Sequence, residues 1–123
     1  MSKYKAKKMV IDGMVFDSKK ELRRYNVLKV LEESGVISGL RRQVEFLLIP
    51  EKREPNTIGS RGGVHKGKLI ERKCSYVADF VYVKNREVVV EDVKGYKGGG
   101  AYEVFAIKRK LMLHIHGIRV TEV

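Results

Sequence analysis

The chain predicts an α/β fold, a mixed central β-sheet flanked by helices, from three features of its 123 residues. Residues 19–33 contain no proline or glycine and end at Ser34-Gly35, which indicates a helix. Residues 74–83 and 87–93 are apolar on both faces, as in strands that are covered on both sides. Residues 102–115 predict a second helix. A single domain is expected, because a chain of this length supports one modest core.

The N-terminal half predicts a basic tail, the first helix and a long extended segment. Residues 1–8 hold four lysines and form the tail. Residues 9–16 should be extended, with a turn at Asp12-Gly13, and should lead directly into the helix. Residues 36–50 should also be extended, because large apolar residues occupy alternate positions from 44 to 48.

The C-terminal half predicts two strands, a helix and a last strand. Before them, residues 50–73 contain both prolines of the chain and many basic residues, which favours a flexible basic flap. A tight turn at 84–86 should join the two strands. The second helix should end before Gly117, and a strand at 118–123 should close the fold. The core-facing stripe of this helix is expected to consist of Val104, Leu111 and Ile115. The expected order is therefore helix, three strands, helix, strand.

The charge of the chain favours a polyanionic partner. Its 26 Lys and Arg exceed its 15 Asp and Glu and give a net charge of +11, and nucleic acid is the simplest partner for so basic a domain. The sequence contains neither an apolar stretch of membrane-spanning length nor a signal-peptide pattern, so no association with membranes is expected. Cys74 is the only cysteine, which excludes an internal disulfide and fits the reducing cytoplasm.

Two charged residues close the strand at 87–93. Because residues two apart share one face of a strand, Asp92 and Lys94 should lie beside each other with Val88 and Val90. Burial of a carboxylate and an ammonium costs several kcal/mol unless each is paired or bound to a metal. The pattern therefore indicates either a structural ion pair or a chemical site.

Asp79 is the second charged residue of this kind, since it is the only charge between Cys74 and Lys84. Adjacent strands would bring Asp79 and Asp92 together with Lys94 nearby. One or two carboxylates with several waters form the usual protein site for Mg²⁺. A metal at such a site polarises a phosphate oxygen and acidifies a bound water, and a lysine steadies the developing charge.

These residues resemble the signature of the PD-(D/E)XK nuclease superfamily, in which an acid on one strand precedes an acid-x-lysine on the next. Asp79 and the run Asp92-Val93-Lys94 match that order. A small phage and prophage group, usually described only as a domain of unknown function, is a closer resemblance. Its pattern is matched at 12–13, 16–21, 78–80 and 91–95 and at Lys108 and Lys110. Ala78 stands where the superfamily name has proline.

The resemblance implies a restriction-endonuclease-like fold and roles for several residues. Asp79 and Asp92, helped by the Val93 carbonyl, would bind Mg²⁺ or Mn²⁺, and Lys94 would position the attacking water. Glu21 would assist through a second metal or a water, although Ser18-Lys19-Lys20-Glu21 is also a capping box that would only stabilise the helix. Lys108 would either support the scissile phosphate or extend along the apolar surface to water.

The resemblance and the charge together imply an endonuclease that acts on DNA structure, on branched DNA such as Holliday junctions. By analogy with junction resolvases, it would be a homodimer, encoded by a phage or prophage and active in the bacterial cytoplasm. The alternatives are a nicking or sequence-specific duplex endonuclease, and a basic nucleic-acid-binding module without catalysis. The residues expected to contact DNA are Lys7, Lys8, Arg61, Lys66, Lys68, Lys97 and Lys110.

Overall fold

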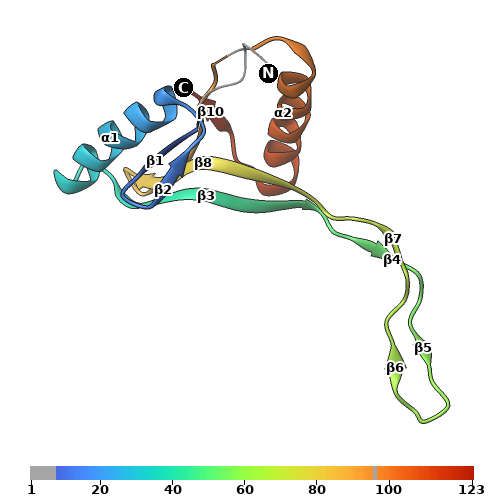
Figure 1. Cartoon of the computed structure of the whole chain (residues 1–123). Coiled ribbons are helices and arrows are strands. Elements are labelled where there is room, and N and C mark those ends of the chain that lie inside the picture. Colours follow the sequence, from blue (N-terminus) through green and yellow to red (C-terminus); the bar gives the residue numbers. More distant parts are fainter. Residues whose placement is uncertain (1–7, 96) are drawn as a thin grey trace.

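A computed structural model describes residues 8–95 and 97–123 of the chain (Figure 1). The elements, in chain order, are β1 (Met9–Ile11), β2 (Met14–Phe16), α1 (Lys19–Glu33), β3 (Ser38–Ile49), β4 (Lys52–Arg53), β5 (Thr57–Ile58), β6 (Val64–His65), β7 (Leu69–Glu71), β8 (Cys74–Lys84), β9 (Glu87–Asp92), α2 (Gly99–Leu111), the π-helical turn η1 (Met112–His116) and β10 (Val120–Glu122). The basic tail at 1–7 lies outside the described residues.

The central sheet has four strands in the order β10-β9-β8-β3. β10 is parallel to β9, whereas β9, β8 and β3 are antiparallel neighbours. A two-residue turn joins β8 to β9, with Asn85 and Arg86 both at positive φ, as tight hairpins require. The predicted α/β class, the mixed sheet and the order of helices and strands are confirmed.

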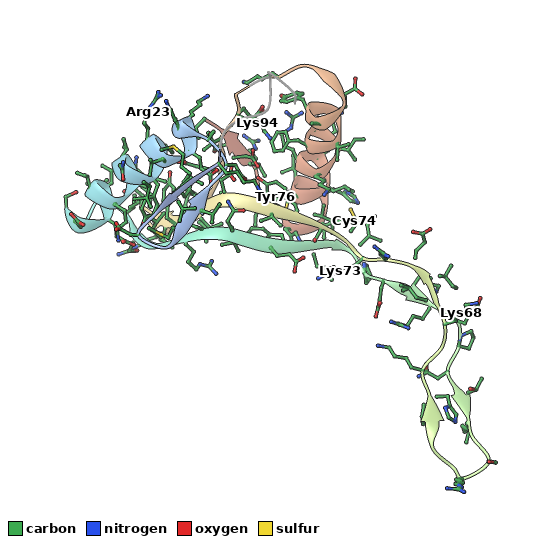
Figure 2. All side chains as sticks on the ribbon, viewed as in Figure 1. Arg23, Lys68, Lys73, Cys74, Tyr76 and Lys94 are labelled. Atoms are coloured by element: carbon green, nitrogen blue, oxygen red, sulfur yellow. The ribbon has the colours of Figure 1, made fainter. Side chains whose placement is uncertain are left out.

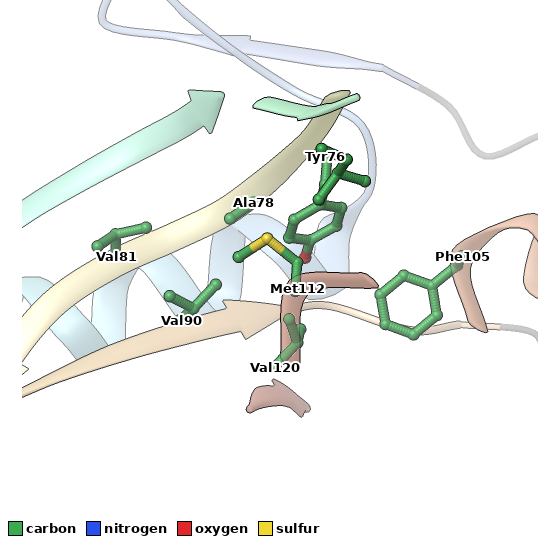
Figure 3. Packing of buried hydrophobic residues seen from close by; sticks show 8 residues of the cluster. Tyr76, Ala78, Val81, Val90, Phe105, Met112 and Val120 are labelled. Atoms are coloured by element: carbon green, nitrogen blue, oxygen red, sulfur yellow. The ribbon is translucent and has the colours of Figure 1, made fainter. Parts of the chain in front are cut away.

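Two clusters of buried side chains connect the sheet to the two helices. The α1 cluster contains Leu28, Ile37, Phe80 and Tyr82. The α2 cluster contains Leu48, Tyr76, Ala78, Val81, Val90, Phe105, Met112 and Val120 (Figure 3). Val89 packs with the α1 cluster and its neighbour Val90 with the α2 cluster, so the helices cover opposite faces of β9. The second half of β9, from Val89 to Asp92, is thus covered on both sides, as predicted, whereas Glu87 and Val88 at its start are exposed.

The alternation of β8 reverses at Asp79. Tyr76 and Ala78 pack in the α2 cluster, whereas Phe80 and Tyr82 pack in the α1 cluster. In a regular strand these four even-numbered residues would share one face. The reversal lets α1 and α2 pack on successive parts of the same long strand.

β3 has a matching irregularity at Gln43. Its backbone has φ +51°, a left-handed conformation that costs a non-glycine residue about 1 kcal/mol. Leu40, before it, packs with the α1 cluster, and Val44, after it, packs with the α2 cluster. The two strands therefore change faces together, where Gln43 lies opposite Asp79.

The segment at 50–73 forms a hairpin arm. Its short strands β4 and β7 pair with each other, as do β5 and β6, so β3 and β8 continue into an antiparallel ribbon. The ribbon extends away from the body of the molecule (Figure 1). The segment predicted as a flexible basic flap thus contains paired strands, with a shift of register between Lys52 and Arg53.

The second helix differs from its prediction in start and in orientation. It begins at Gly99 and places Phe105 and Met112 in the core. Two members of the predicted stripe are on the surface, since Val104 is 54% exposed and Ile115 43% exposed. Burial of the larger Phe105 ring outweighs that of Val104 in setting which face turns inward. The prediction of that stripe was wrong.

Candidate active site

The residues predicted for the site meet where β8 and β9 approach the start of α1. Asp92 is the last residue of β9, and Lys94 follows two residues later. The backbone there continues to pair with the chain end, because Val123 N donates to Asp92 O and Lys94 N donates to Val123 O, both at 2.9 Å. Asp92 and Lys94 thus keep strand-like spacing and share one face, as predicted.

Asp92 is buried and carries two strong contacts. Lys94 Nζ lies 2.6 Å from Asp92 Oδ1, and the Tyr76 hydroxyl donates to Asp92 Oδ2 at 2.5 Å (Figure 2). Lys94 Nζ also lies 3.4 Å from the centre of the Phe105 ring, within cation–π distance. Burial and the neighbouring Asp92 raise the pKa of Tyr76, so its hydroxyl remains a donor.

Asp79 lies beside this pair and is held by the backbone. Val93 N donates to Asp79 Oδ2 at 2.8 Å, and Gln43 Nε2 donates to Asp79 Oδ1 at 3.2 Å. The same Gln43 amide donates to Glu21 Oε1 at 3.1 Å. Gln43 therefore bridges the acid of α1 to the acid of β8, and its left-handed backbone lies at the centre of the site.

The local field disfavours a charged Asp79. Burial is the largest cause that raises the pKa of Asp79 to about 6, with further contributions from the negative charges of Asp92 and Glu21. The Val93 amide and Gln43 oppose this change but do not overcome it. The three carboxylates thus form one electrostatic unit whose negative charge is only partly neutralised.

Glu21 has two roles at once. Its backbone N–H donates to Ser18 Oγ at 3.1 Å, which is the expected helix cap. Its Oε2 accepts from Asp17 N at 3.0 Å. In a standard capping box this return bond would come from Ser18 N, so here it is displaced by one residue. Its Oε1 contacts Gln43 and lies 3.6 Å from Arg42.

Glu91 provides a contrast on the other face of β9. Arg24 of α1 donates to it from Nε and Nη2 at 2.8 and 2.6 Å, and the Tyr82 hydroxyl also donates to it. Burial and Glu91 raise the pKa of Tyr82 to about 12. This carboxylate is neutralised by a bidentate arginine, so it serves as a structural counterpart to its neighbour Asp92.

The donors fit a divalent cation in part. Within residues 8–95 and 97–123, no three Asp, Glu, His or Cys side chains converge closely enough to hold a metal. Asp79 and Asp92 offer two carboxylates, which is the number that Mg²⁺ usually takes from a protein. The raised pKa of Asp79 marks uncompensated negative charge that a cation would relieve.

A family model matches residues 1–121. The chain belongs to DUF1064, a family described as protein of unknown function. No curated protein matches the chain. No solved structure matches it. None of the described helices is both long enough and apolar enough to cross a membrane.

The site was only partly visible in the sequence. Gln43 and Tyr76 were not predicted, because neither carries a charge. Their side chains reach the acids because β3 and β8 change faces near Gln43 and Asp79, and no simple pattern in the sequence predicts that change. Lys108 of α2 is half-buried, one turn after Phe105 and one turn before Met112 of η1. No hydrogen bond or ion pair joins its side chain to another described residue.

The basic residues predicted to contact DNA are spread over the surface. Arg61, Lys66 and Lys68 belong to the arm, and Figure 2 shows Lys68 far from Lys94. The described members of the set are all exposed, namely Lys8, Arg61, Lys66, Lys68, Lys97 and Lys110. Lys7 lies outside the described residues. Lys97 is 3.9 Å from Glu122, and Lys66 is 3.9 Å from Glu51.

Proposed function

We propose that this protein is a metal-dependent DNA endonuclease that hydrolyses phosphodiester bonds. The observation that carries the proposal is a half-buried Asp79, with a pKa raised to about 6, beside the Asp92–Lys94 pair. Acids at strand ends with a neighbouring lysine are suited to metal-assisted phosphoryl chemistry. The resemblance to PD-(D/E)XK nucleases, which rests on these same residues, agrees with this proposal.

In the proposed reaction, a bound Mg²⁺ or Mn²⁺ supplies Lewis-acid chemistry and an acidified water. Asp79, Asp92 and the Val93 carbonyl would hold the cation. Lys94, which pairs with Asp92, would orient the attacking water and stabilise the developing negative charge. Gln43 and Glu21 keep Asp79 in position. Hydrolysis adds one water across a P–O bond and leaves a phosphate end and a hydroxyl end.

The proposed substrate is branched DNA such as a Holliday junction, cut by a homodimer. The net charge of +11 and the projecting arm support a large polyanionic substrate. The same proposal places this activity in the cytoplasm of a bacterium that carries a phage or prophage. The alternative within the enzyme class is a duplex nickase or a sequence-specific endonuclease.

A second candidate is a nucleic-acid-binding module without catalysis. The contacts of Asp92 favour it, since Lys94 and Tyr76 together satisfy this carboxylate without a metal. In that case the pair would stabilise the junction of β9 and α2. Binding would depend steeply on salt, and no divalent cation would produce cleavage.

The test is cleavage of a labelled panel of four-way junction, splayed arm, nicked duplex and linear duplex, with Mg²⁺ or Mn²⁺. Wild type is compared with Asp92→Ala, Lys94→Ala and the exposed control Lys84→Ala. Junction-selective cutting that is lost in the first two variants, with binding retained, is the expected result. Equal cutting of all four DNAs would remove the branch preference, and tight binding without cutting would favour the second candidate.

A further inference from the structure

The arm formed by β4, β5, β6 and β7 has a charge distribution unlike that of the body. Residues 50–73 contain seven Lys and Arg against three Glu. Arg61, Lys66 and Lys68 are exposed. Lys66 Nζ lies 3.9 Å from Glu51, and Glu54 N donates to Lys68 O at 2.8 Å, so these two lysines lie beside acids. Residues 56–65, which form the tip and include Arg61, contain no Asp or Glu. The arm is therefore positive overall, and its tip carries no acid.

Two large apolar side chains are exposed at the same end. Ile58 of β5 is paired across the ribbon with Val64 of β6, and the two are 78% and 69% exposed. An isolated two-stranded ribbon is marginally stable in water, and one cross-strand aliphatic pair adds less than about 1 kcal/mol to it. Exposed apolar side chains of this kind are expected where another molecule covers them.

The ribbon is built to be narrow. A Cβ on Gly67 would lie 1.7 Å from the carbonyl oxygen of Glu54, and a Cβ on Gly59 would lie 2.3 Å from His65 Nε2. The two chains are also joined by Gly59 N to Gly63 O at 2.7 Å and by Gly67 N to Asn56 Oδ1 at 3.0 Å. A slender two-stranded ribbon is a shape that a DNA groove admits.

We propose that the far end of the arm seats in a groove of duplex DNA, with Ile58 and Val64 against base and sugar surfaces and Arg61, Lys66 and Lys68 on the flanking phosphates. Charge complementarity selects this occupant, because an arm with a net positive charge and a tip without acids suits a polyanion. Apolar side chains inserted among bases are an established mode of groove binding. The inference rests on the proposed function in taking DNA as the substrate.

The length of the arm sets where this contact falls. Ile58 lies nine residues beyond Ile49, the end of β3, so extended chain carries it about 30 Å from the sheet. One turn of DNA is about 34 Å long. The arm would therefore hold duplex roughly one turn away from the DNA at the acidic site, and recognition would require a duplex arm of that length.

The experiment compares wild type with the double variant Ile58→Thr/Val64→Thr, which keeps β-branched side chains in the ribbon. Val88→Thr, an exposed strand valine on the β8–β9 hairpin, is the matched control. A triple variant, Arg61→Gln/Lys66→Gln/Lys68→Gln, removes the charges only. Affinity for four-way junctions with short or long duplex arms is measured by anisotropy in Ca²⁺ over a range of salt, and footprints are recorded.

The double variant should bind long-armed DNA about tenfold more weakly, with an unchanged salt slope, and should lose about one turn of footprint. The triple variant should lower the salt slope by nearly three. Both should match wild type on arms shorter than one turn. Unchanged affinity and footprint of the double variant would overturn the arm contact, as would an equal loss on short and long arms. Cleavage of short-armed junctions in Mg²⁺ is scored separately, so failure of the nuclease proposal leaves the arm test intact.

Discussion

Asp79 is the residue whose ionisation depends most on the fold. Its pKa is raised to about 6, mainly by burial and then by Asp92 and Glu21, so the folded protein holds this proton to higher pH than the unfolded chain. Stability should therefore fall as pH rises from about 4 to 6, by roughly 3 kcal/mol at most from this group.

Asp79→Asn removes that titration. The variant should match wild type near pH 4 and become more stable than wild type above pH 6, as measured by urea unfolding at a series of pH values. A wild type that gained stability relative to the variant over this range would show that Asp79 is held as a stabilised carboxylate.

A divalent cation should offset the loss of stability that ionisation of Asp79 causes. Because it binds only the folded state, Mg²⁺ or Mn²⁺ at about a hundred times its dissociation constant adds about 2.7 kcal/mol at pH 7. Thermal melting should show this rise in wild type and in Glu91→Gln, whose carboxylate faces α1, but not in Asp79→Asn. A rise of equal size in Asp79→Asn would place the cation elsewhere.

At this scale the sequence predicted the charged residues better than their uncharged neighbours. Asp92 and Lys94 could be placed on one face from their spacing alone. Gln43 and Tyr76 could not, because their positions depend on the reversal of β3 and β8, and neither left-handed φ at a glutamine nor a buried hydroxyl has a local signature.

At the scale of elements, the N-terminus of α1 combines a cap and a candidate catalytic acid. Ser18→Ala removes only the cap and should cost about 1 kcal/mol of stability without loss of cleavage. Glu21→Gln can still accept from Asp17 N, but its NH2 group then faces the donors Gln43 and Arg42, so it should melt somewhat lower than wild type and cut at least tenfold more slowly. Melting curves and single-turnover cleavage of the same preparations distinguish the two. Glu21→Gln that melts lower yet cuts normally would reduce Glu21 to a capping residue.

The arm offers a second test at this scale. Gly67→Ala places a methyl group 1.7 Å from the Glu54 carbonyl oxygen, whereas a Cβ on Gly63 meets nothing within 4 Å. Gly67→Ala should abolish amide protection within 53–68 and leave the melting temperature of the body within about 2 °C, because the arm adds no buried side chains to it. Equal protection in Gly67→Ala and Gly63→Ala would contradict the narrow ribbon.

Element boundaries followed from the sequence where local signals were strong. The helix at 19–33 was correct at both ends because Ser18 caps it and Gly35 ends it at positive φ. The second helix started three residues early and turned Phe105 inward, since packing and not periodicity chose its buried face. The strand pairing of the arm at 50–73 was not predicted, because strands of two or three residues are too short to show an alternating pattern.

At the scale of the whole molecule, one face of β9 carries a neutralised carboxylate and the other an acidic site. Glu91 and Asp92 are adjacent, both buried, and turned toward α1 and α2 respectively. If Glu91 and Asp92 only stabilised the fold, replacing either carboxylate should have similar consequences. The proposed nuclease needs Asp92 for chemistry and Glu91 only for stability.

The measurement that tests this most directly is single-turnover cleavage of a four-way junction in Mn²⁺ by wild type, Asp92→Asn and Glu91→Gln, below the melting temperature of each. We expect Asp92→Asn to cut about a hundredfold more slowly or not at all, with Glu91→Gln within about threefold of wild type. Cleavage by Asp92→Asn at the wild-type rate, or no cleavage by wild type itself, would contradict the account.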